Sequence, residues 1–287
     1  MKNLFRHEVV SDRVIRIFDT VGDVIYLIIG DERAAVLDTG YGIGDLKEYV
    51  SQFTSLPVTA LITHGHRDHA MGAGQFEAWL SPLDREKYIS DADPRRRNAG
   101  LDRAQEKFDS GLIPWADRPE ESDLQPVHDA DELKPIYEGK FYDLGGITVE
   151  AYNVRGHSDG SMVFLMPELR LLDVGDAIGF VTRIFCTVTE YRDDLKKVQE
   201  HCAGRYDSII GPHGKGTHPM GIIEGALEAC EAVLDGTDDK IPFIHPDKEI
   251  FGGRDMRYAK EMVKDENGMH RKDGGIGGLV YDSALIK

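Results

Sequence analysis

The sequence predicts an α/β protein in which strands and helices form a layered sandwich. Apolar, β-branched runs alternate along the chain with segments whose apolar residues recur at helical spacing. Some of the predicted strands follow one another through short turns and so form hairpins, whereas others are separated by helices. A mixture of hairpins and helical connections is typical of sheets that carry helices on their faces.

The first half of the chain begins with strands and ends in an irregular segment. Strands are predicted in RVIRIFD (13–19), DVIYLIIGDERAAVLDTG (23–40), VTALIT (58–63) and around QFEAWLSP (75–82). GDLKEYVSQF (44–53) is predicted to be a helix, because its apolar residues fall on one face. Residues 82–135 are charged, contain proline and are weakly periodic, so we expect a mainly helical insertion there, with a helix near Ala99 to Phe108.

The second half returns to the alternating pattern. Strands are predicted in ITVEAYNVRG (147–156), SMVFLM (161–166), LRLLDVG (169–175) and YDSIIGPHG (206–214). Helices are predicted in EYRDDLKKVQEHCA (190–203) and GIIEGALEACEAVLDG (221–236). We therefore expect one domain over residues 1–240, interrupted by the insertion at about 82–135. Residues 241–287 are glycine-rich and are expected to be a C-terminal extension that packs on the domain or on a partner subunit.

Composition and charge limit the partners and the compartment. The chain has 287 residues and a formal net charge of −17, which repels nucleic acid and anionic membrane surfaces, so neither is expected as a partner. No run of 18 apolar residues and no apolar core of a signal peptide is present. The three cysteines lie far apart, which argues against a disulfide framework and favours a reducing cytoplasm as the location.

A cluster of metal-ligand side chains follows the predicted strand at 58–63. ALITHGHRDHAMGAG (60–74) contains the pattern H-x-H-x-D-H, formed by His64, His66, Asp68 and His69. Four imidazole and carboxylate groups so close together repel one another when charged, and a bound cation removes that repulsion. Neutral imidazole and carboxylate are ligands for zinc, manganese or iron, so the pattern predicts a metal site.

Three further candidate ligands follow other predicted strands. His157 lies in VRGHSDGS, Asp176 in LLDVGDAI and His213 in IIGPHGKG, each beside glycine. Two metals need about six protein ligands with one of them shared, and these residues complete such a set. Ligands at strand ends around one edge of a sandwich are what a shared site requires.

From about Phe18 to Gly216, these motifs in this order resemble the metallo-β-lactamase-fold hydrolase superfamily. The resemblance implies a four-layer αββα sandwich with a dinuclear site on its open edge. It implies that His64, His66 and His157 hold the first metal, that Asp68, His69 and His213 hold the second, and that Asp176 bridges them. It also implies that Asp38, in VLDTG, supports the site through a contact to a ligand.

The chemistry expected from this resemblance is hydrolysis by a metal-bridged hydroxide. Two divalent cations, zinc first and manganese or iron as alternatives, lower the pKa of a bridging water, and Asp68 orients it as the catalytic carboxylate. An ester, lactone or thioester of a small molecule is the expected substrate. Two alternatives stay open: an iron-dependent persulfide dioxygenase of the same fold, and a non-catalytic metal- or ligand-binding member.

Three residues near the ligands are candidates for the substrate pocket: Tyr41, Phe180 and Lys215. Packing would explain the two aromatic residues equally well, and a solvated loop would explain the lysine. The insertion is longer than the fold needs, so we expect it to be a lid or an oligomer contact, with a homo-oligomer as one form of the protein.

Overall fold

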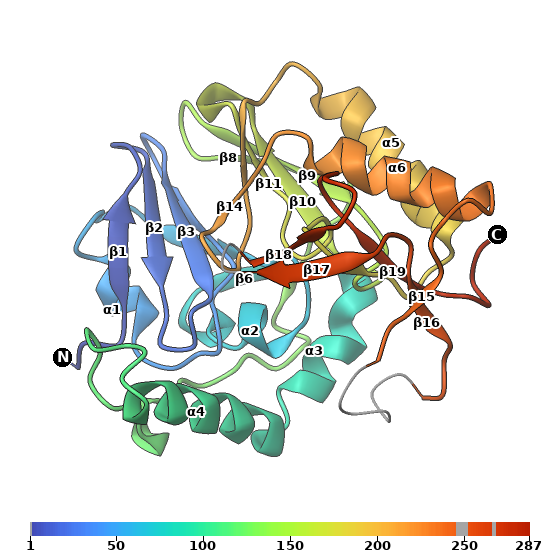
Figure 1. Ribbon diagram of the computed structural model, residues 1–287. Coiled ribbons are helices and arrows are strands. Elements are labelled where there is room, and N and C mark those ends of the chain that lie inside the picture. The colour runs from blue at the N-terminus through green and yellow to red at the C-terminus, as the bar shows by residue number, and fades with distance from the viewer. Residues whose placement is uncertain (1, 245–251, 266–267) are drawn as a thin grey trace.

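The computed structural model describes residues 2–244, 252–265 and 268–287, and these form four layers (Figure 1). Two large sheets face each other in the middle, and helices cover the outer face of each. The order of the layers is that of the predicted αββα sandwich. Within the described residues, no helix is both long and apolar enough to cross a membrane.

The N-terminal sheet has seven strands in sequence order. They are β1 (Arg6–Val9), β2 (Val14–Phe18), β3 (Val24–Ile29), β4 (Ala34–Leu37), β5 (Val58–Leu61), β6 (Glu77–Leu80) and β7 (Lys134–Pro135). The first four strands pair antiparallel, whereas β4 to β7 pair parallel. Parallel neighbours need crossover connections. Helices α1 (Leu46–Val50) and α2 (Arg67–Ala70) lie in the crossovers that join β4, β5 and β6.

The second sheet has six strands. In spatial order they are β14 (Thr217–His218), β13 (Ser208–Ile210), β11 (Leu171–Asp173), β10 (Met162–Met166), β9 (Thr148–Asn153) and β8 (Phe141–Asp143). Helices α5 (Val188–Cys202) and α6 (Ile222–Leu234) pack against its outer face. Short 3-10 helices occur at η1 (Ala73–Gln75), η2 (Pro82–Asp84), η3 (Glu121–Asp123) and η4 (Pro167–Leu169).

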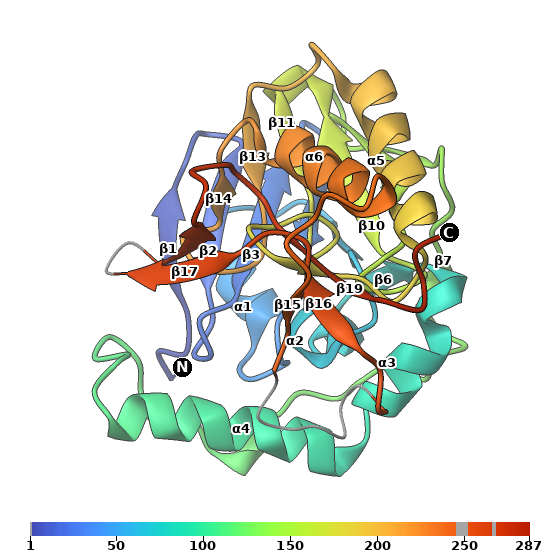
Figure 2. The same ribbon diagram turned by 45° about the vertical axis from the view of Figure 1, so that its right-hand side comes forward.

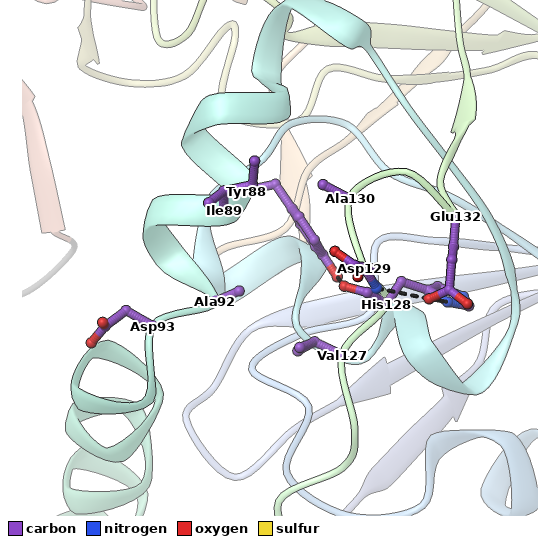
Figure 3. Close-up of a pocket in the computed structure, with 9 residues that line it drawn as sticks. All are labelled: Tyr88, Ile89, Ala92, Asp93, Val127, His128, Asp129, Ala130 and Glu132. Atoms are coloured by element: carbon purple, nitrogen blue, oxygen red, sulfur yellow. Dashed lines mark hydrogen bonds and ion pairs between the residues drawn. The ribbon is translucent and has the colours of Figure 1, made fainter.

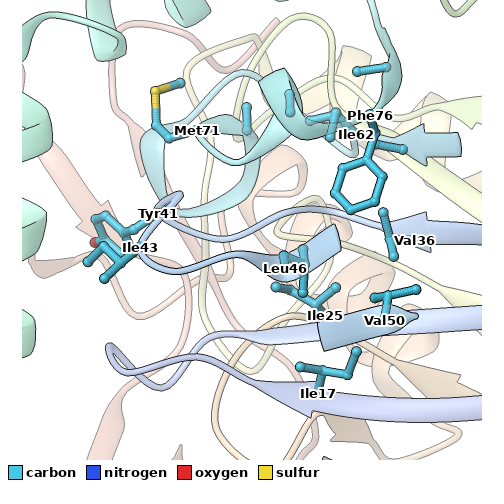
Figure 4. Close-up of a cluster of buried hydrophobic side chains, with 14 of the residues drawn as sticks. Ile17, Ile25, Val36, Tyr41, Ile43, Leu46, Val50, Ile62, Met71 and Phe76 are labelled. Atoms are coloured by element: carbon cyan, nitrogen blue, oxygen red, sulfur yellow. The ribbon is translucent and has the colours of Figure 1, made fainter. Parts of the chain in front are cut away.

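Central strands of the N-terminal sheet are buried on both faces. In β3, Val24, Tyr26 and Ile28 point into the core between the two sheets. Ile25 and Leu27 alternate with them and belong to a second core, on the outer side of the sheet. There Leu46 and Val50 of α1 lie with side chains of β2, β3 and β4 (Figure 4). Burial on two sides explains why these strands are apolar throughout, without the polar alternation of a half-exposed strand.

The insertion contains the helix predicted near Ala99 to Phe108 and a further helix before it. Helix α3 (Arg85–Asp91) is followed by α4 (Pro94–Asp109), which includes the predicted stretch from Ala99 to Phe108 but starts earlier. The early start has a local cause: Asp93 caps the helix by accepting a hydrogen bond from the backbone N–H of Arg95 at 2.9 Å. Pro94 in the first turn fits the same helix start.

The described residues of the C-terminal extension pack on their own chain. They supply β15 (Ile241–Pro242), β16 (Met256–Tyr258) and β19 (Leu279–Asp282) to a four-stranded sheet that is completed by β12 (Thr182–Arg183). A hairpin of β17 (Met262–Asp265) and β18 (Gly268–Arg271) precedes β19 (Figure 2). A Cβ atom at Gly225 of α6 would lie 1.4 Å from the carbonyl oxygen of Ile276, so the extension lies directly on that helix.

Candidate metal centre

The predicted ligands come from loops that follow strands in both sheets. His64 follows β5, His157 follows β9, Asp176 follows β11 and His213 follows β13. His66 precedes the short helix α2, and Asp68 and His69 lie within it. The structure brings all seven side chains together at one edge of the sandwich.

One group of ligand atoms consists of three imidazole nitrogens. Nε2 of His64 lies 2.8 Å from Nδ1 of His66, and Nε2 of His157 lies 2.9 Å from the same Nδ1 atom. Nitrogen atoms of the three rings therefore converge on one point, as the predicted first metal position requires.

The second group consists of Asp68, His69 and His213. Nε2 of His69 lies 3.7 Å from a carboxylate oxygen of Asp68, and that oxygen lies 3.9 Å from Nε2 of His213. His213 is the most open of these side chains, with 44% exposed, whereas His69 is fully buried. The centre is therefore open to solvent on the His213 side.

Asp176 lies between the two groups. Its carboxylate is 3.4 Å from Nε2 of His157, 3.0 Å from Nε2 of His213 and 3.7 Å from Nε2 of His69. A carboxylate with two oxygens can bind one cation with each. Asp176 is therefore placed where a ligand shared by the two groups would have to lie.

Polar groups behind the ligands fix the orientation of three imidazole rings. Nδ1 of His69 lies 2.8 Å from Asp38, and Nδ1 of His213 lies 2.9 Å from Asp23. Nδ1 of His64 lies 3.1 Å from the hydroxyl of Thr63. A carboxylate partner keeps the proton on Nδ1 and leaves the lone pair of Nε2 for a metal.

Asp38 does more than contact His69. It also accepts hydrogen bonds from the backbone N–H and the hydroxyl of Thr63, at 2.7 and 2.8 Å. Its backbone has a φ of +62°, a conformation that is uncommon for residues other than glycine. This conformation of the loop after β4 lets the buried Asp38 carboxylate contact two places in the H-x-H-x-D-H segment. It binds Thr63, directly before the segment, and His69, its last residue.

An unpaired buried nitrogen supports the fit of a cation. Nε2 of His69 is buried and has no hydrogen-bond partner among the described residues. Leaving a buried polar atom unpaired is costly, and a metal ion would satisfy it. Imidazole nitrogen and carboxylate oxygen are a donor set for zinc, manganese or iron, so the residues present fit divalent metals.

Burial and neighbouring charges divide the histidines into two kinds. Burial, reinforced by nearby imidazoles, holds the pKa values of His64 and His66 well below the ordinary histidine value. Burial likewise lowers the pKa of His157 to about 4, so these three rings are neutral and can bind a metal at neutral pH.

The opposite shift occurs at the second group. Although burial opposes it, Asp176 and Asp23 raise the pKa of His213 to about 10. Burial also opposes the shift at Asp176, but His69 and His213 hold the pKa of its carboxyl well below the usual range. A cation at this group therefore competes with protons, whereas a cation at the three-histidine group does not.

The three candidate pocket residues occupy different environments. Tyr41 is buried against α4, where a Cβ atom at Gly100 would lie 2.4 Å from its ring. Phe180 is 43% exposed, and its ring centroid lies 5.3 Å from that of His218. Lys215 is exposed in the loop that follows β13. A role for these residues in substrate binding stays a prediction.

Four residues that support the ligands were missed by sequence reasoning. They are Asp23, Thr63, Asp84 and Asp91, and each makes a hydrogen bond to a ligand or to the loop that carries one. Their partners lie up to 190 residues away, as for Asp23 and His213. The position of Thr63, directly before His64, could have indicated its supporting role. The three carboxylates are not marked by any local sequence pattern.

A separate open groove lies between α3 and residues 127–132 (Figure 3). Its volume is about 520 Å³, and its lining includes Tyr88, whose hydroxyl donates to the carbonyl of His128 at 3.1 Å. None of its lining residues is one of the seven candidate ligands. The groove is thus distinct from the candidate metal centre.

Comparisons with known proteins agree with the fold. The sequence profile of the metallo-beta-lactamase superfamily matches residues 20–245. An atrochrysone carboxyl ACP thioesterase from Aspergillus novofumigatus is 25% identical over 68% of this chain and 52% of its own length. A lactamase-like protein from Pestalotiopsis fici is 23% identical over 69% of this chain and 55% of its own length. The chain thus spans about half the length of these curated relatives.

Solved structures share the fold at low identity. A double mutant of a sec-alkyl sulfatase matches with a TM-score of 0.58 and 16% identity, over 82% of this chain and 42% of that chain. A metallo-beta-lactamase from Erythrobacter litoralis matches with a TM-score of 0.53 and 14% identity, over 79% of this chain and 96% of that chain.

Proposed function

Because the chain belongs to the metallo-beta-lactamase superfamily, we propose that it is a metal-dependent hydrolase that cleaves an ester, lactone or thioester bond of a small molecule. The position of Asp176 carries the proposal. Its carboxylate lies within 3.4 Å of both His157 and His213, one from each group of candidate ligands. A carboxylate shared in this way favours a dinuclear centre.

The residues divide between two cations. His64, His66 and His157 would hold one, Asp68, His69 and His213 would hold the other, and Asp176 would contact both. Two divalent cations, with zinc as the first candidate, lower the pKa of a water molecule and polarise a carbonyl group. The protein's own side chains would carry out every other step of the reaction.

Asp68 is the candidate catalytic carboxylate. It belongs to the second ligand group and is partly exposed, so an incoming substrate can reach it. We propose that its carboxylate orients the attacking water. It would accept a proton from that water and return one to the leaving alkoxide or thiolate.

Cysteine chemistry is a poor alternative for this chain. Burial raises the pKa values of Cys186, Cys202 and Cys230 to about 12 each. A thiol with such a pKa carries almost no thiolate at neutral pH and is a weak nucleophile. Attack by an activated water therefore accounts better for hydrolysis than a covalent thioester intermediate.

The choice among bonds rests on weaker support. The Aspergillus novofumigatus relative is named as a thioesterase, which favours a thioester among the three bond types. The iron-dependent persulfide dioxygenase needs one metal, and the complete second group of Asp68, His69 and His213 argues for two. The same complete set argues against a member that has lost catalysis.

The proposal is tested with a substrate panel assayed with and without a chelator. Short acyl thioesters, aryl esters and lactones are incubated with the metal-loaded protein and with the His66→Ala variant. We expect hydrolysis of at least one class, its loss on chelation and its return when zinc is restored. Unchanged activity in His66→Ala, or oxygen uptake with glutathione persulfide in place of hydrolysis, would contradict the proposal.

A further inference from the structure

Two buried carboxylates in the first part of the insertion face the loop that carries H-x-H-x-D-H. Asp84 directly precedes α3 and Asp91 is its last residue, and their exposed fractions are 1% and 2%. Each end of α3 therefore has a carboxylate that hydrogen-bonds to the same loop. Neither residue is among the candidate metal ligands.

Asp84 connects the two loops that supply the three-histidine group. One carboxylate oxygen accepts a hydrogen bond from the backbone N–H of Gly65 at 2.8 Å and from the hydroxyl of Ser158 at 2.7 Å. The other accepts from the backbone N–H of Gly160 at 2.8 Å. Gly65 lies between His64 and His66, and Ser158 follows His157, so one side chain spans the segments that carry all three ligands.

Both glycines allow this close approach. A Cβ atom at Gly65 would lie 2.7 Å from the carbonyl oxygen of Asp84, and one at Gly160 would lie 2.7 Å from its carboxylate carbon. Any side chain at either position would push Asp84 away from its partners. Two of the three partners are backbone N–H groups, which can only donate, so the arrangement favours the ionised carboxylate, against the burial that raises the pKa of Asp84.

Asp91 holds the next part of the same loop. It accepts a hydrogen bond from the backbone N–H of Arg67 at 3.1 Å, and its other oxygen accepts from the guanidinium of Arg96 in α4 at 2.6 Å. The N–H groups of residues 65 and 67 therefore each donate to a buried carboxylate of the 84–91 segment.

We propose that Asp84 is a positioning residue for the three-histidine metal site, and that Asp91 supports the same loop more weakly. The inference rests on the proposed metal binding. Ligand atoms must lie within about 0.2 Å of their ideal metal distances, so two loops that move independently cannot hold a tight site. Asp84 fixes the position of His157 relative to His64 and His66 through three hydrogen bonds. The first residues of the insertion therefore support the metal centre. This holds whether the rest of the insertion, including α4, is a lid or an oligomer contact.

The test is zinc titration of metal-free protein in competition with a chromogenic chelator. For Asp84→Asn we expect the affinity of the three-histidine site to fall about 10- to 100-fold, the usual range for groups that orient ligands. For Ser158→Ala, which loses one of the three hydrogen bonds, we expect a smaller decrease. Two background variants separate the two sites. His213→Ala disrupts the second group and keeps the three histidines, whereas His157→Ala removes one of the three histidines and keeps the second group. Asp84→Asn is introduced into each background.

The expected pattern is selective. Asp84→Asn should weaken zinc binding in the His213→Ala background and leave it unchanged in the His157→Ala background. Glu150→Gln is the matched control, because Glu150 is a buried carboxylate whose side-chain partners are Arg205 and Tyr152. It should lower the melting temperature without changing zinc affinity.

Three results would overturn the inference, and each has a different meaning. Equal zinc affinities in wild type, Asp84→Asn and Ser158→Ala would refute the role of Asp84 and leave the metal centre intact. A wild-type protein that binds no zinc would refute the proposed function as well. Equal weakening by Asp84→Asn in both backgrounds would indicate a general loss of stability instead of positioning.

Discussion

At the scale of single residues, three of the candidate ligands depend on a partner outside the ligand set. His69 contacts Asp38, His213 contacts Asp23 and His64 contacts Thr63, all through Nδ1. These contacts select the nitrogen that faces the centre. The orientation of the rings is therefore built into the fold.

Asp38→Asn tests this dependence. An amide can donate where a carboxylate only accepts, so it no longer holds the proton on Nδ1 of His69. We expect the affinity for the second metal to fall about 10- to 100-fold, measured by competition with a chelator.

Asp173→Asn is the matched control for Asp38→Asn. Asp173 is also buried, and burial together with the nearby Asp38 raises its pKa to about 8, so its carboxyl is mostly protonated at pH 7. An amide there replaces a neutral group and should leave metal affinity nearly unchanged. Equal effects of the two substitutions would refute the specific role of Asp38.

The sequence predicted the candidate ligands and the supporting residue Asp38, which contacts His69, but not the other residues that support the ligands. His64, His66, Asp68 and His69 are close in the chain, and their spacing was enough to indicate a metal. Asp84 and Asp91 lie 19 and 24 residues from their partners in that loop. Their role depends on how α3 packs, and no local pattern records it.

At the scale of elements, α5 is tied to the loop that carries His157. Asp194 of α5 accepts hydrogen bonds from the backbone N–H and the guanidinium of Arg155, at 3.1 Å and 2.8 Å. Arg155 lies two residues before His157. The contact therefore links the helical layer to the metal centre.

This contact predicts a pH dependence of stability. Burial raises the pKa of Asp194, but the hydrogen bonds from Arg155 outweigh it and hold the pKa below the ordinary value of 3.8. A group whose pKa is lower in the folded state contributes stability above the unfolded value, and that stability is lost as the pH falls through the folded value.

We expect Asp194→Asn to lower the free energy of unfolding at pH 7 by about 1.5–3 kcal/mol. Below about pH 4 the difference from wild type should shrink. Urea unfolding at several pH values measures both effects. The exposed neighbour Asp193 provides the control variant Asp193→Asn, and an equally large effect there would refute the account.

The contact of α6 with the C-terminal extension gives a second element-scale prediction. Alanine normally stabilises a helix interior relative to glycine by about 1 kcal/mol. At Gly225, however, a Cβ atom would lie 1.4 Å from the carbonyl oxygen of Ile276. We therefore expect Gly225→Ala to destabilise the protein by about 1–3 kcal/mol in urea unfolding.

Gly221→Ala is the control for Gly225→Ala. The nearest atom to a Cβ there is a side-chain carbon of Ile276 at 3.6 Å, which is an ordinary contact. We expect a smaller loss, about 0.5–1 kcal/mol, because glycine is favoured over alanine at the N-cap of α6. A stabilising Gly225→Ala would show that the extension does not lie on α6 in solution.

At the scale of the whole molecule, the order of the four layers could be predicted from the sequence, but the shortest strands could not. The apolar runs of β2, β3, β5, β9 and β10 are long enough to indicate strands. Strands of two residues such as β7, β12 and β15 have no periodicity to detect. The extension forms a sheet because β12 and α6 offer it a surface, and such contacts are not visible in composition.

The negative net charge and the clustered candidate ligands both favour bound cations. A chain of net charge −17 brings four carboxylates, Asp23, Asp38, Asp68 and Asp176, to one edge together with five histidines. Cations relieve the repulsion that this arrangement creates. We therefore propose that two divalent metals occupy this edge.

The most direct test is the metal content of protein purified without added metal and then dialysed against buffered zinc. We predict about two zinc ions per chain in the wild type and about one in His157→Ala, with hydrolytic activity only in the doubly loaded form. One iron per chain with oxygen consumption, or a wild type that retains no metal, would contradict the account.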